Sequence, residues 1–434
     1  MHIAIITAGG AGMFCGSCMH DNTWARALQK AGAEVTLIPT YTPIRVDEED
    51  VSQQKIFFGG INVYLEHHFP FWQKLPRWMI HWLDSPCVIQ FATRFGISND
   101  AKKLGELTVD MLQGEQGSLY HEVDELVDFL TLQLQPDVIC FSNVLLSGAV
   151  SQLRERFEGK ILCTLQGDDV FLNDLTKEYR EAAIALIASR VACFDGFITH
   201  SQFYADAMSQ YMTFPREKFY QLPLGIDLAD HDGQPRSRKN EDDFTIGFFA
   251  RICPEKGLHR LIHAFLPLHE EFPHVKLQVG GYLGARDADY FQQQLARVEH
   301  LGDAFTYIGS PQTHAEKVAF YKSCDIVSVP TEYKEPKGLS LLEAMANGVP
   351  IVQPAHGAFP EMIQATNGGL LVEPNNSVVL TDAFKQLLVD EPLRMQLATA
   401  GHAAVHAKYN SATMAAKSLQ LFNDIAMPQE SKKR

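Results

Sequence analysis

Short apolar runs rich in β-branched residues alternate along the chain with segments in which apolar residues recur at helical spacing. In the first half, the apolar runs occupy residues 2–8, 34–41, 137–143, 160–165 and 196–201. Segments between them, such as 22–30 and 182–192, have helical periodicity. Strands that alternate with helices in this way predict a parallel sheet that is covered by helices on both faces.

The same alternation restarts after Gly225. Six further apolar runs occupy residues 245–250, 275–280, 305–309, 325–330, 350–354 and 368–372. The sequence therefore predicts an α/β fold with two doubly wound, Rossmann-like domains. The polar, turn-rich stretch 227–243 marks the join, and a hinge there would leave a cleft between the domains.

These patterns predict three parts. Residues 1–226 form an N-terminal domain, residues 227–410 a C-terminal domain, and residues 411–434 a helix with a tail. The helix places Ala415 and Phe422 on one apolar face, so we expect it to pack back on the N-terminal domain.

An irregular stretch at about 66–117 interrupts the alternation and contains Trp72, Trp78 and Trp82. Its apolar stripe at helical spacing favours a helical insertion that packs on its own domain. The alternative is a surface for an acceptor or a membrane, because tryptophan beside lysine and arginine suits an interface.

Composition excludes several classes of protein. Hydrophobic residues make up 46% and charged residues 21% of 434 residues, which argues against a disordered, collagen-like or coiled-coil chain. The 37 basic and 52 acidic residues give a formal charge of −15, which would repel nucleic acid. The N-terminus has neither a basic region nor a long apolar run, so we expect a cytoplasmic protein, with peripheral contact to the inner membrane face as a further hypothesis.

The segment Cys15-Gly16-Ser17-Cys18 has the spacing of a redox pair or of half a zinc site. No second pair follows at the spacing of a zinc finger. We therefore favour two ordinary thiols in a glycine-rich loop.

The strongest candidate site follows a predicted buried strand in the second half. Gly338 allows a sharp turn, and residues 339–347 have helix-forming composition. The N–H groups at a helix start bind phosphate well. Glu335 in the loop and Glu343 one turn inside the helix can then contact different parts of one extended ligand.

A second loop carries Arg251 and Lys256 between a predicted strand and a helix. Both cations can reach the same cleft. Together with a helix start, they would stabilise the charge that develops when a diphosphate leaves.

These residues carry a resemblance to glycosyltransferase family 4. It rests on the Arg251-x4-Lys256 and Glu335-x7-Glu343 segments and on the sequence Leu-Pro-Leu-Gly-Ile-Asp that ends at Asp227. The resemblance implies a GT-B fold, in which two Rossmann-like domains face each other across a cleft. It also implies a nucleotide-diphosphate sugar as donor and transfer of a hexose-type sugar with retention.

The resemblance also implies residue roles. Arg251 and Lys256 would hold the donor diphosphate, and Glu335 would lie beside the donor sugar. Glu343 would bind the ribose hydroxyls. Amides near Gly338 and Leu339 would contact the phosphates or the sugar.

Further implied contacts come from the first half of the chain. Gly10 and Gly12 would let backbone approach the reacting centre. Gln166 stands where family members often carry histidine; it can hydrogen-bond a sugar but cannot carry a proton at neutral pH.

We expect neither a metal nor a cofactor, because Arg251 and Lys256 already supply positive charge. The pair Asp168-Asp169 is the metal alternative. The expected partners are a nucleotide-sugar donor and an unidentified carbohydrate or lipid-linked acceptor. Rival interpretations are a nucleotide-sugar epimerase and a catalytically silent nucleotide-sugar-binding protein.

Overall fold

The computed structural model describes residues 1–9, 14–57, 101–237 and 243–426. They form two compact units. Unit 1 comprises Met1–Leu222 and Met414–Arg434, and unit 2 comprises Pro223–Thr413. The division falls shortly before the predicted end of the first domain at residue 226, so the polar stretch 227–243 belongs to unit 2.

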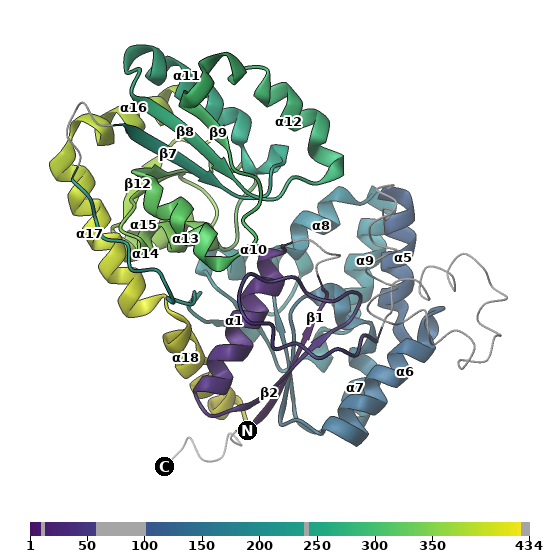
Figure 1. Cartoon of the computed structure of the whole chain (residues 1–434). Coiled ribbons are helices and arrows are strands. Elements are labelled where there is room, and N and C mark those ends of the chain that lie inside the picture. Colours follow the sequence, from purple (N-terminus) through teal and green to yellow (C-terminus); the bar gives the residue numbers. More distant parts are fainter. Residues whose placement is uncertain (10–13, 58–100, 238–242, 427–434) are drawn as a thin grey trace. The chain divides into compact units, whose positions relative to one another are not determined.

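Unit 1 is built on a parallel sheet that has six strands among the described residues, in the order β2-β1-β3-β4-β5-β6 (Figure 1). The strands are β1 His2–Thr7, β2 Glu34–Pro39, β3 Val138–Phe141, β4 Lys160–Thr164, β5 Gly196–Thr199 and β6 Phe219–Gln221. The helices are α1 Gly16–Lys30, α5 Ala101–Gln113, α6 Tyr120–Asp128, α7 Val150–Arg156, α8 Asp168–Asp174, α9 Lys177–Ser189, α10 Gln202–Met212 and α18 Ser411–Ala426. The three-residue edge strand β6 is the strand that periodicity did not predict.

Alternation along β1 explains why helices cover both faces of this sheet. Ile3 and Ile5 point into one apolar core, and Ala4 and Ile6 point into another. Successive side chains of a strand face opposite ways, so a strand that is apolar throughout needs cover on both sides.

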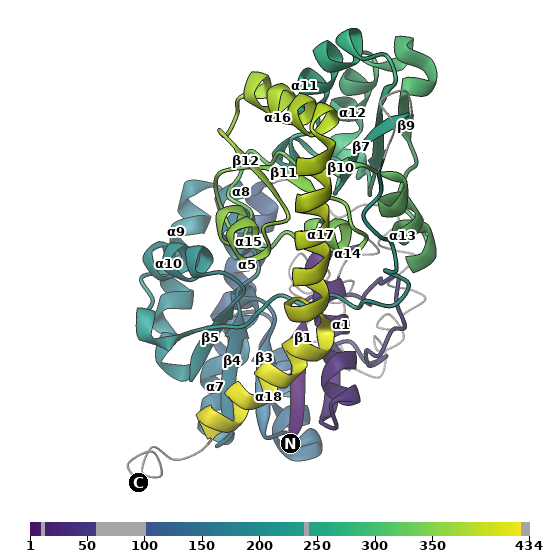
Figure 2. The ribbon, with the colours of Figure 1, turned by 90° about the vertical axis from the view of Figure 1, so that its left-hand side faces the viewer.

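The C-terminal helix α18 lies beside α1 on one of these faces (Figures 1 and 2). Trp24 of α1 donates its indole N–H to the Ser418 hydroxyl at 2.9 Å. Its ring centroid lies 6.1 Å from that of Phe422, which is fully buried. The apolar face of α18 is thus buried in unit 1, although residues 223–413 separate the helix from the rest of that unit in sequence.

Unit 2 has a second parallel sheet, with six described strands in the order β12-β11-β10-β7-β8-β9. They are β7 Phe244–Phe249, β8 Val275–Gly280, β9 Phe305–Tyr307, β10 Ile326–Val327, β11 Ile351–Pro354 and β12 Gly369–Val372. The helices are α11 Leu258–Glu271, α12 Ala288–Leu295, α13 His314–Ser323, α14 Leu339–Ala346, α15 Phe359–Thr366, α16 Ser377–Val389 and α17 Glu391–Lys408. Helix α11 packs beside α16, and α14 packs beside α17 (Figure 2).

Strand order locates the ligand-binding edge of each sheet. In unit 2 the order reverses between β7 and β10, and in unit 1 it reverses between β1 and β3. In open α/β sheets, ligands bind outside the carboxyl ends of the strands at such a switch point. The loops that follow β7, β10, β1 and β3 are therefore where a site is expected.

The predicted insertion at about 66–117 is described only from residue 101, where α5 begins. The Trp72, Trp78 and Trp82 stretch lies outside the described residues. None of the helices within the described ranges is both long enough and apolar enough to cross a membrane.

Candidate nucleotide-sugar site

In unit 2, a backbone hydrogen bond joins the loop after β7 to the loop after β10 at the switch point. Glu332 N–H, in the loop after β10, donates to the carbonyl of Glu255, in the loop after β7, at 2.9 Å. Gly257 has φ +77°, and a Cβ added there would lie 1.9 Å from the carbonyl oxygen of Pro330. Only glycine permits both that φ and that approach.

The approach of the loops brings together two of the predicted residues. Lys256 Nζ donates to Glu335 Oε2 at 2.6 Å and to Tyr333 Oη at 2.5 Å. The Tyr333 hydroxyl in turn donates to Glu335 Oε2. The Lys256 and Glu335 side chains are only 21% and 10% exposed, so the pair is largely removed from water.

Charge keeps both members of this pair ionised. Burial alone would lower the pKa of Lys256, but the Glu335 carboxylate holds that pKa above its usual value. Burial likewise acts to raise the pKa of Glu335, but Lys256 holds it below its usual value. Burial and the neighbouring Glu335 raise the pKa of Tyr333, so its hydroxyl stays protonated.

Helix α14 begins directly beyond this pair. Gly338 lies immediately before it with φ +88°, a conformation that side chains other than glycine rarely adopt. The first N–H groups of a helix, which start here at Leu339, lack helical acceptors in the preceding turn. Lys337, which precedes Gly338, is buried and contributes positive charge next to Glu335.

Glu343 lies one turn inside α14 in a different environment. Its Oε1 forms an ion pair with Lys317 Nζ at 2.8 Å, and its Oε2 accepts from the Tyr321 hydroxyl at 2.7 Å. The Lys317 and Glu343 side chains are 4% and 11% exposed. Glu343 is therefore part of a buried ion pair between α13 and α14, in addition to any role in binding.

Arg251 is exposed, and its Nε lies 3.4 Å from the Cys253 sulfur. Its guanidinium also faces negative charge from Glu255 and Asp287. The geometry thus groups Lys256 with Glu335, whereas Arg251 lies at the start of the same loop with contacts of its own.

In unit 1, Gln166 follows β4 and is buried at the carboxyl edge of the sheet. Its Nε2 donates to Asp21 Oδ1 at 3.0 Å and to the Ser142 carbonyl at 3.1 Å. Asp21, on α1, also accepts from the Thr7 hydroxyl at 2.8 Å. Gln166 therefore joins three elements around this edge. Gly10 and Gly12 lie outside the described residues.

The acidic pair next to Gln166 has a structural role in the described part of the chain. Asp168 accepts from the Val144 N–H at 2.7 Å and from the Gln166 N–H at 2.9 Å. Burial raises the pKa of Asp168 from 3.8 to about 6. Asp169 accepts from the Tyr204 hydroxyl at 2.6 Å. No group of three or more histidine, cysteine or acidic residues that could hold a metal occurs among the described residues.

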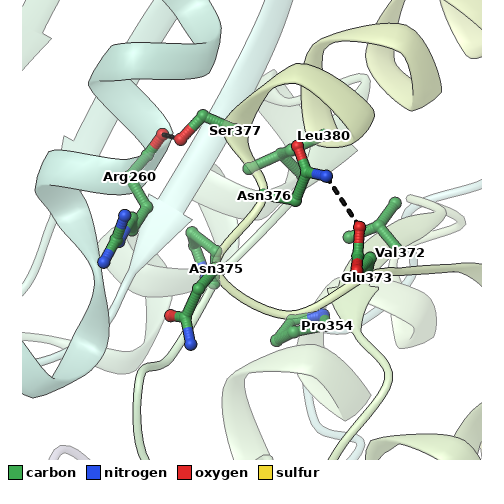
Figure 3. Close-up of a pocket in the computed structure, with 9 residues that line it drawn as sticks. Arg260, Pro354, Val372, Glu373, Asn375, Asn376, Ser377 and Leu380 are labelled. Carbon is green, nitrogen blue, oxygen red and sulfur yellow. Dashed lines mark hydrogen bonds between the residues drawn. The ribbon is translucent and has the colours of Figure 1, made fainter.

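A small pocket lies at the carboxyl ends of β11 and β12 in unit 2 (Figure 3). The Asn376 amide donates to Glu373 Oε2 across it at 2.7 Å, and Arg260 lines it from α11. Pro330, which packs on Gly257, also lines it. The lining includes none of the predicted site residues, so this pocket adjoins the Lys256–Glu335 pair without containing it.

Comparison with known proteins adds to this geometry. Residues 232–403 match the family model for glycosyl transferases group 1. D-inositol 3-phosphate glycosyltransferase of Corynebacterium aurimucosum is 36% identical over 41% of this chain and 42% of its own length. The enzyme of that name from Mycobacteroides abscessus is 34% identical over 38% of this chain and 36% of its length. The chain thus spans less than half the length of these two relatives.

Two solved structures match nearly the whole chain. Sucrose-phosphate synthase from Thermosynechococcus elongatus superposes with a TM-score of 0.71 at 19% identity and covers 98% of this chain and 99% of its own. HepE from Anabaena, in complex with UDP and glucose, has a TM-score of 0.66 at 17% identity and covers 98% of this chain and all of its own. These matches confirm the predicted GT-B type of fold with two Rossmann-like units. The match to the family model supports the resemblance to glycosyltransferases, at the level of group 1, for residues 232–403.

Two neighbours of the predicted residues were missed by the sequence analysis. Tyr333 lies two positions before Glu335 in a loop that bends at residues 332 and 333, so no regular periodicity indicated it. No pattern in the sequence indicated that Lys317 would pair with Glu343. It lies on another helix, and its pairing with Glu343 depends on how α13 packs against α14.

Proposed function

We propose that this protein is a metal-independent, retaining glycosyltransferase that moves a hexose-type sugar from a nucleotide-diphosphate sugar to a hydroxyl acceptor. Unit 2 binds the donor and unit 1 binds the acceptor. The observation that supports this proposal most is the largely buried Lys256–Glu335 pair at the switch point of unit 2, beside the start of α14.

Lys256 is suited to a diphosphate because of how its ammonium group is held. An ammonium has three N–H donors, and contacts with Tyr333 and Glu335 use two of them. The third is directed by those two contacts and donates to a phosphate oxygen of the donor. A fixed donor stabilises the leaving diphosphate without reorganisation during the reaction.

Glu335 is suited to the sugar. Its Oε2 accepts from both Lys256 and Tyr333, and its Oε1 accepts from a hydroxyl of the donor sugar. The lowered pKa of Glu335 keeps this carboxylate ionised at neutral pH, which strengthens that hydrogen bond. The N–H groups of Gly338 and Leu339 bind the phosphates or the sugar from the other side.

Arg251 and Glu343 complete the donor site in this proposal. Arg251 contacts the diphosphate with its exposed guanidinium, and Glu343 accepts from the ribose hydroxyls. Lys317 and Tyr321 fix the carboxylate of Glu343 from behind.

Transfer with retention follows a front-face path. The leaving phosphate oxygen takes the proton of the acceptor hydroxyl as the new glycosidic bond forms, so no protein base is needed on that side of the sugar. Gln166, in place of a histidine, fits this path because an amide carries no transferable proton at neutral pH. Gln166, Gly10 and Gly12 contribute to binding of the sugar and the acceptor.

The names of the similar proteins indicate which substrates to test first. HepE was solved with UDP and glucose, which favours a uridine diphosphate sugar as donor. Relatives named for inositol phosphate and sucrose phosphate favour a sugar phosphate or polyol phosphate as acceptor. A lipid-linked acceptor, suggested by Trp72, Trp78 and Trp82, is the competing class.

A thermal-shift screen of nucleotide sugars tests the donor first, because a bound ligand raises the melting temperature by mass action. The stabilising donor is then incubated with sugar phosphates, polyol phosphates and lipid-linked sugars, with and without EDTA. We expect a product whose anomeric configuration, read by nuclear magnetic resonance, matches that of the donor. Inverted product, or loss of all activity with EDTA, would contradict the proposal.

A further inference from the structure

Cys15 and Cys18 lie at the switch point of unit 1. Cys15 ends the loop after β1 and immediately precedes α1, with φ −98° and ψ 124°, and its carbonyl accepts from the Met19 N–H at 2.9 Å. Cys18 lies in the first turn of the same helix. The Cys-x-x-Cys spacing thus coincides with a helix start, where the dipole and the N–H groups stabilise a thiolate.

The two thiols contact each other. Both residues are reduced in the structure, and their side chains are hydrogen-bonded to one another. Side chains three residues apart on a helix have Cβ atoms about 5–6 Å apart, and a disulfide needs about 3.5–4.5 Å. Cys15 has extended rather than helical dihedral angles, so it lies outside the regular turn to which this helical spacing applies.

The two thiols differ in exposure. Cys15 is partly exposed, whereas Cys18 is only 2% exposed. The hydrogen bond with Cys15, burial and the nearby Asp21 carboxylate raise the pKa of Cys18. Cys18 therefore keeps its proton until the outer thiol has reacted. An outer nucleophile and an inner resolving thiol are what stepwise disulfide formation requires.

Other thiols of the described chain lack this arrangement. Cys140 and Cys163 are fully buried on the adjacent strands β3 and β4. A metal site is not supported either, because no cluster of three suitable ligands occurs within the described ranges.

We propose that Cys15 and Cys18 form a redox-active dithiol site that a low-molecular-weight disulfide of the glutathione class converts to an intramolecular disulfide. The Cys15 thiolate attacks one sulfur of the small disulfide, whose S–S bond breaks and releases one thiol. Cys18 then loses its proton and attacks the Cys15 sulfur of the mixed disulfide, releasing a second thiol. Two protein thiols are oxidised, and one small disulfide is reduced to two thiols that take up both protons.

Peptide mapping of the full-length chain tests this site without reference to transferase activity. The chain is incubated in glutathione buffers of graded oxidation, quenched with acid, alkylated in denaturant so that the buried Cys18 also reacts, and digested with trypsin. The peptide that ends at Arg26 contains Cys15 and Cys18 and no other cysteine. We expect it to carry two alkyl groups in excess reduced glutathione. As the buffer becomes oxidising, we expect it to carry none and to be two hydrogen atoms lighter than the unmodified dithiol peptide.

Single substitutions separate the two steps. Cys18→Ala should stop at a mixed disulfide of glutathione on Cys15, and Cys15→Ser should leave Cys18 reduced. Cys193→Ser, which removes a partly exposed thiol elsewhere in unit 1, should oxidise like the wild type. Stable glutathione on Cys15 of the wild type, or one bound zinc that protects both thiols, would overturn the proposal.

Discussion

The two units place different chemistry at the same position of their sheets. At the switch point of unit 2, ionised groups meet: Lys256 with Glu335. At the carboxyl edge of unit 1, the neutral amide of Gln166 donates hydrogen bonds to the Asp21 carboxylate and to the Ser142 carbonyl. One α/β scaffold thus supports an ionic site in one unit and a site built on neutral donors in the other.

The difference lies in how each unit compensates buried charge. In unit 2, buried carboxylates pair with lysines, as in Lys317–Glu343. At the carboxyl edge of unit 1, Asp21 and Asp168 instead accept from hydroxyl and amide groups, and His20 Nδ1 lies 3.4 Å from Asp21 Oδ1. Elsewhere in unit 1, Arg26 and Glu48 form an ion pair at 2.7 Å, so the contrast holds for the sheet edges and not for the whole units. An ion pair fixes a cation that can also bind phosphate, whereas a neutral network orients groups that bind sugar hydroxyls. This contrast fits a donor in unit 2 and an acceptor in unit 1.

The largest predicted effect comes from breaking the ion pair in the core of unit 2. Glu343→Ala leaves the Lys317 ammonium buried without its counter-ion, so we expect it to lower the free energy of unfolding by about 3–5 kcal/mol. In unit 1, Thr7→Val removes one neutral hydrogen bond to Asp21 and should cost about 1–3 kcal/mol. Urea unfolding monitored by circular dichroism measures both. Comparable costs would remove the contrast between the units.

A double substitution separates stability from binding at this position. Lys317→Met combined with Glu343→Gln removes both charges, so most of the lost stability should return. If Glu343 also binds ribose, the affinity for the nucleotide-sugar donor should stay below that of the wild type in the double variant, although its stability is restored. Full recovery of donor affinity would assign Glu343 a structural role alone.

Next in size is the effect of Lys256 on turnover. Lys256→Ala removes a fixed donor to the leaving diphosphate, and we expect turnover to fall at least about a hundredfold. Gln166→Leu removes neutral hydrogen bonds from the unit 1 site and should cost about tenfold. Steady-state rates with the best donor and acceptor measure both.

Lys276→Ala is the matched control for the lysine. Lys276 forms an exposed ion pair with Asp243 at 2.5 Å in unit 2, away from the switch-point loops. The Lys276→Ala substitution should leave the turnover rate at the wild-type level. Equal rates for Lys256→Ala and Lys276→Ala would rule out the assigned role of Lys256.

Acid should affect the two units in opposite directions. Burial, with His314 nearby, lowers the pKa of His231 in unit 2 from 6.5 to about 3. Below pH 6.5 the unfolded chain therefore binds a proton at His231 that the folded unit does not bind. The stability that neutral His231 contributes is fully present above pH 6.5 and is lost as the pH falls towards 3. For Asp168 in unit 1, burial raises the pKa from 3.8 to about 6, so its contribution is present below 3.8 and lost as the pH rises through 6.

Variants of these two residues measure the opposite trends. Between pH 7 and 5, the stability advantage of wild type over His231→Gln should fall by about 2 kcal/mol, and that over Asp168→Asn should rise by about 1 kcal/mol. Hydrogen exchange of amides in each unit separates the two contributions within one chain. Parallel pH profiles for wild type and either variant would contradict the corresponding burial effect.

The smallest predicted effect concerns the helix that returns to unit 1. Trp24→Phe removes the hydrogen bond to Ser418 while keeping an aromatic ring, so we expect a loss of about 1 kcal/mol. Ser418→Ala should cost a similar amount, and the double variant should cost little more than either change alone. Additive losses would show that the indole and the hydroxyl do not act as a pair.

Much of the fold was predictable because local patterns carry it. The runs at 2–8 and 245–250 place apolar residues at consecutive positions, which face both sides of a sheet, so they predict buried parallel strands, and β1 and β7 lie there. The short edge strand β6 was not predicted, because three residues with one buried position give too little periodicity. The stretch from 58 to 100 lies outside the described residues, so the two interpretations of its tryptophans remain predictions.

The candidate site was predictable to a smaller extent. Lys256 and Glu335 could be selected from the motif and from turn residues, because Gly257 directly follows Lys256 and Gly338 lies three residues after Glu335, each marking a turn after a strand. Their direct contact, the third group Tyr333 and the burial of the pair depend on the Gly257–Pro330 approach. The role of Cys15 and Cys18 was open for the same reason, because spacing alone does not report whether two thiols meet.

By itself the sequence determined where most of the strands lie and which side chains stand at strand ends, because periodicity and turn residues are local properties of the chain. Tertiary structure alone decided which charges neutralise each other and which thiols meet. Lys317 and Glu343 lie on different helices, and Lys256 and Glu335 follow different strands. Such pairs form only after strand order brings distant segments together, and their energy depends on how completely water is then excluded.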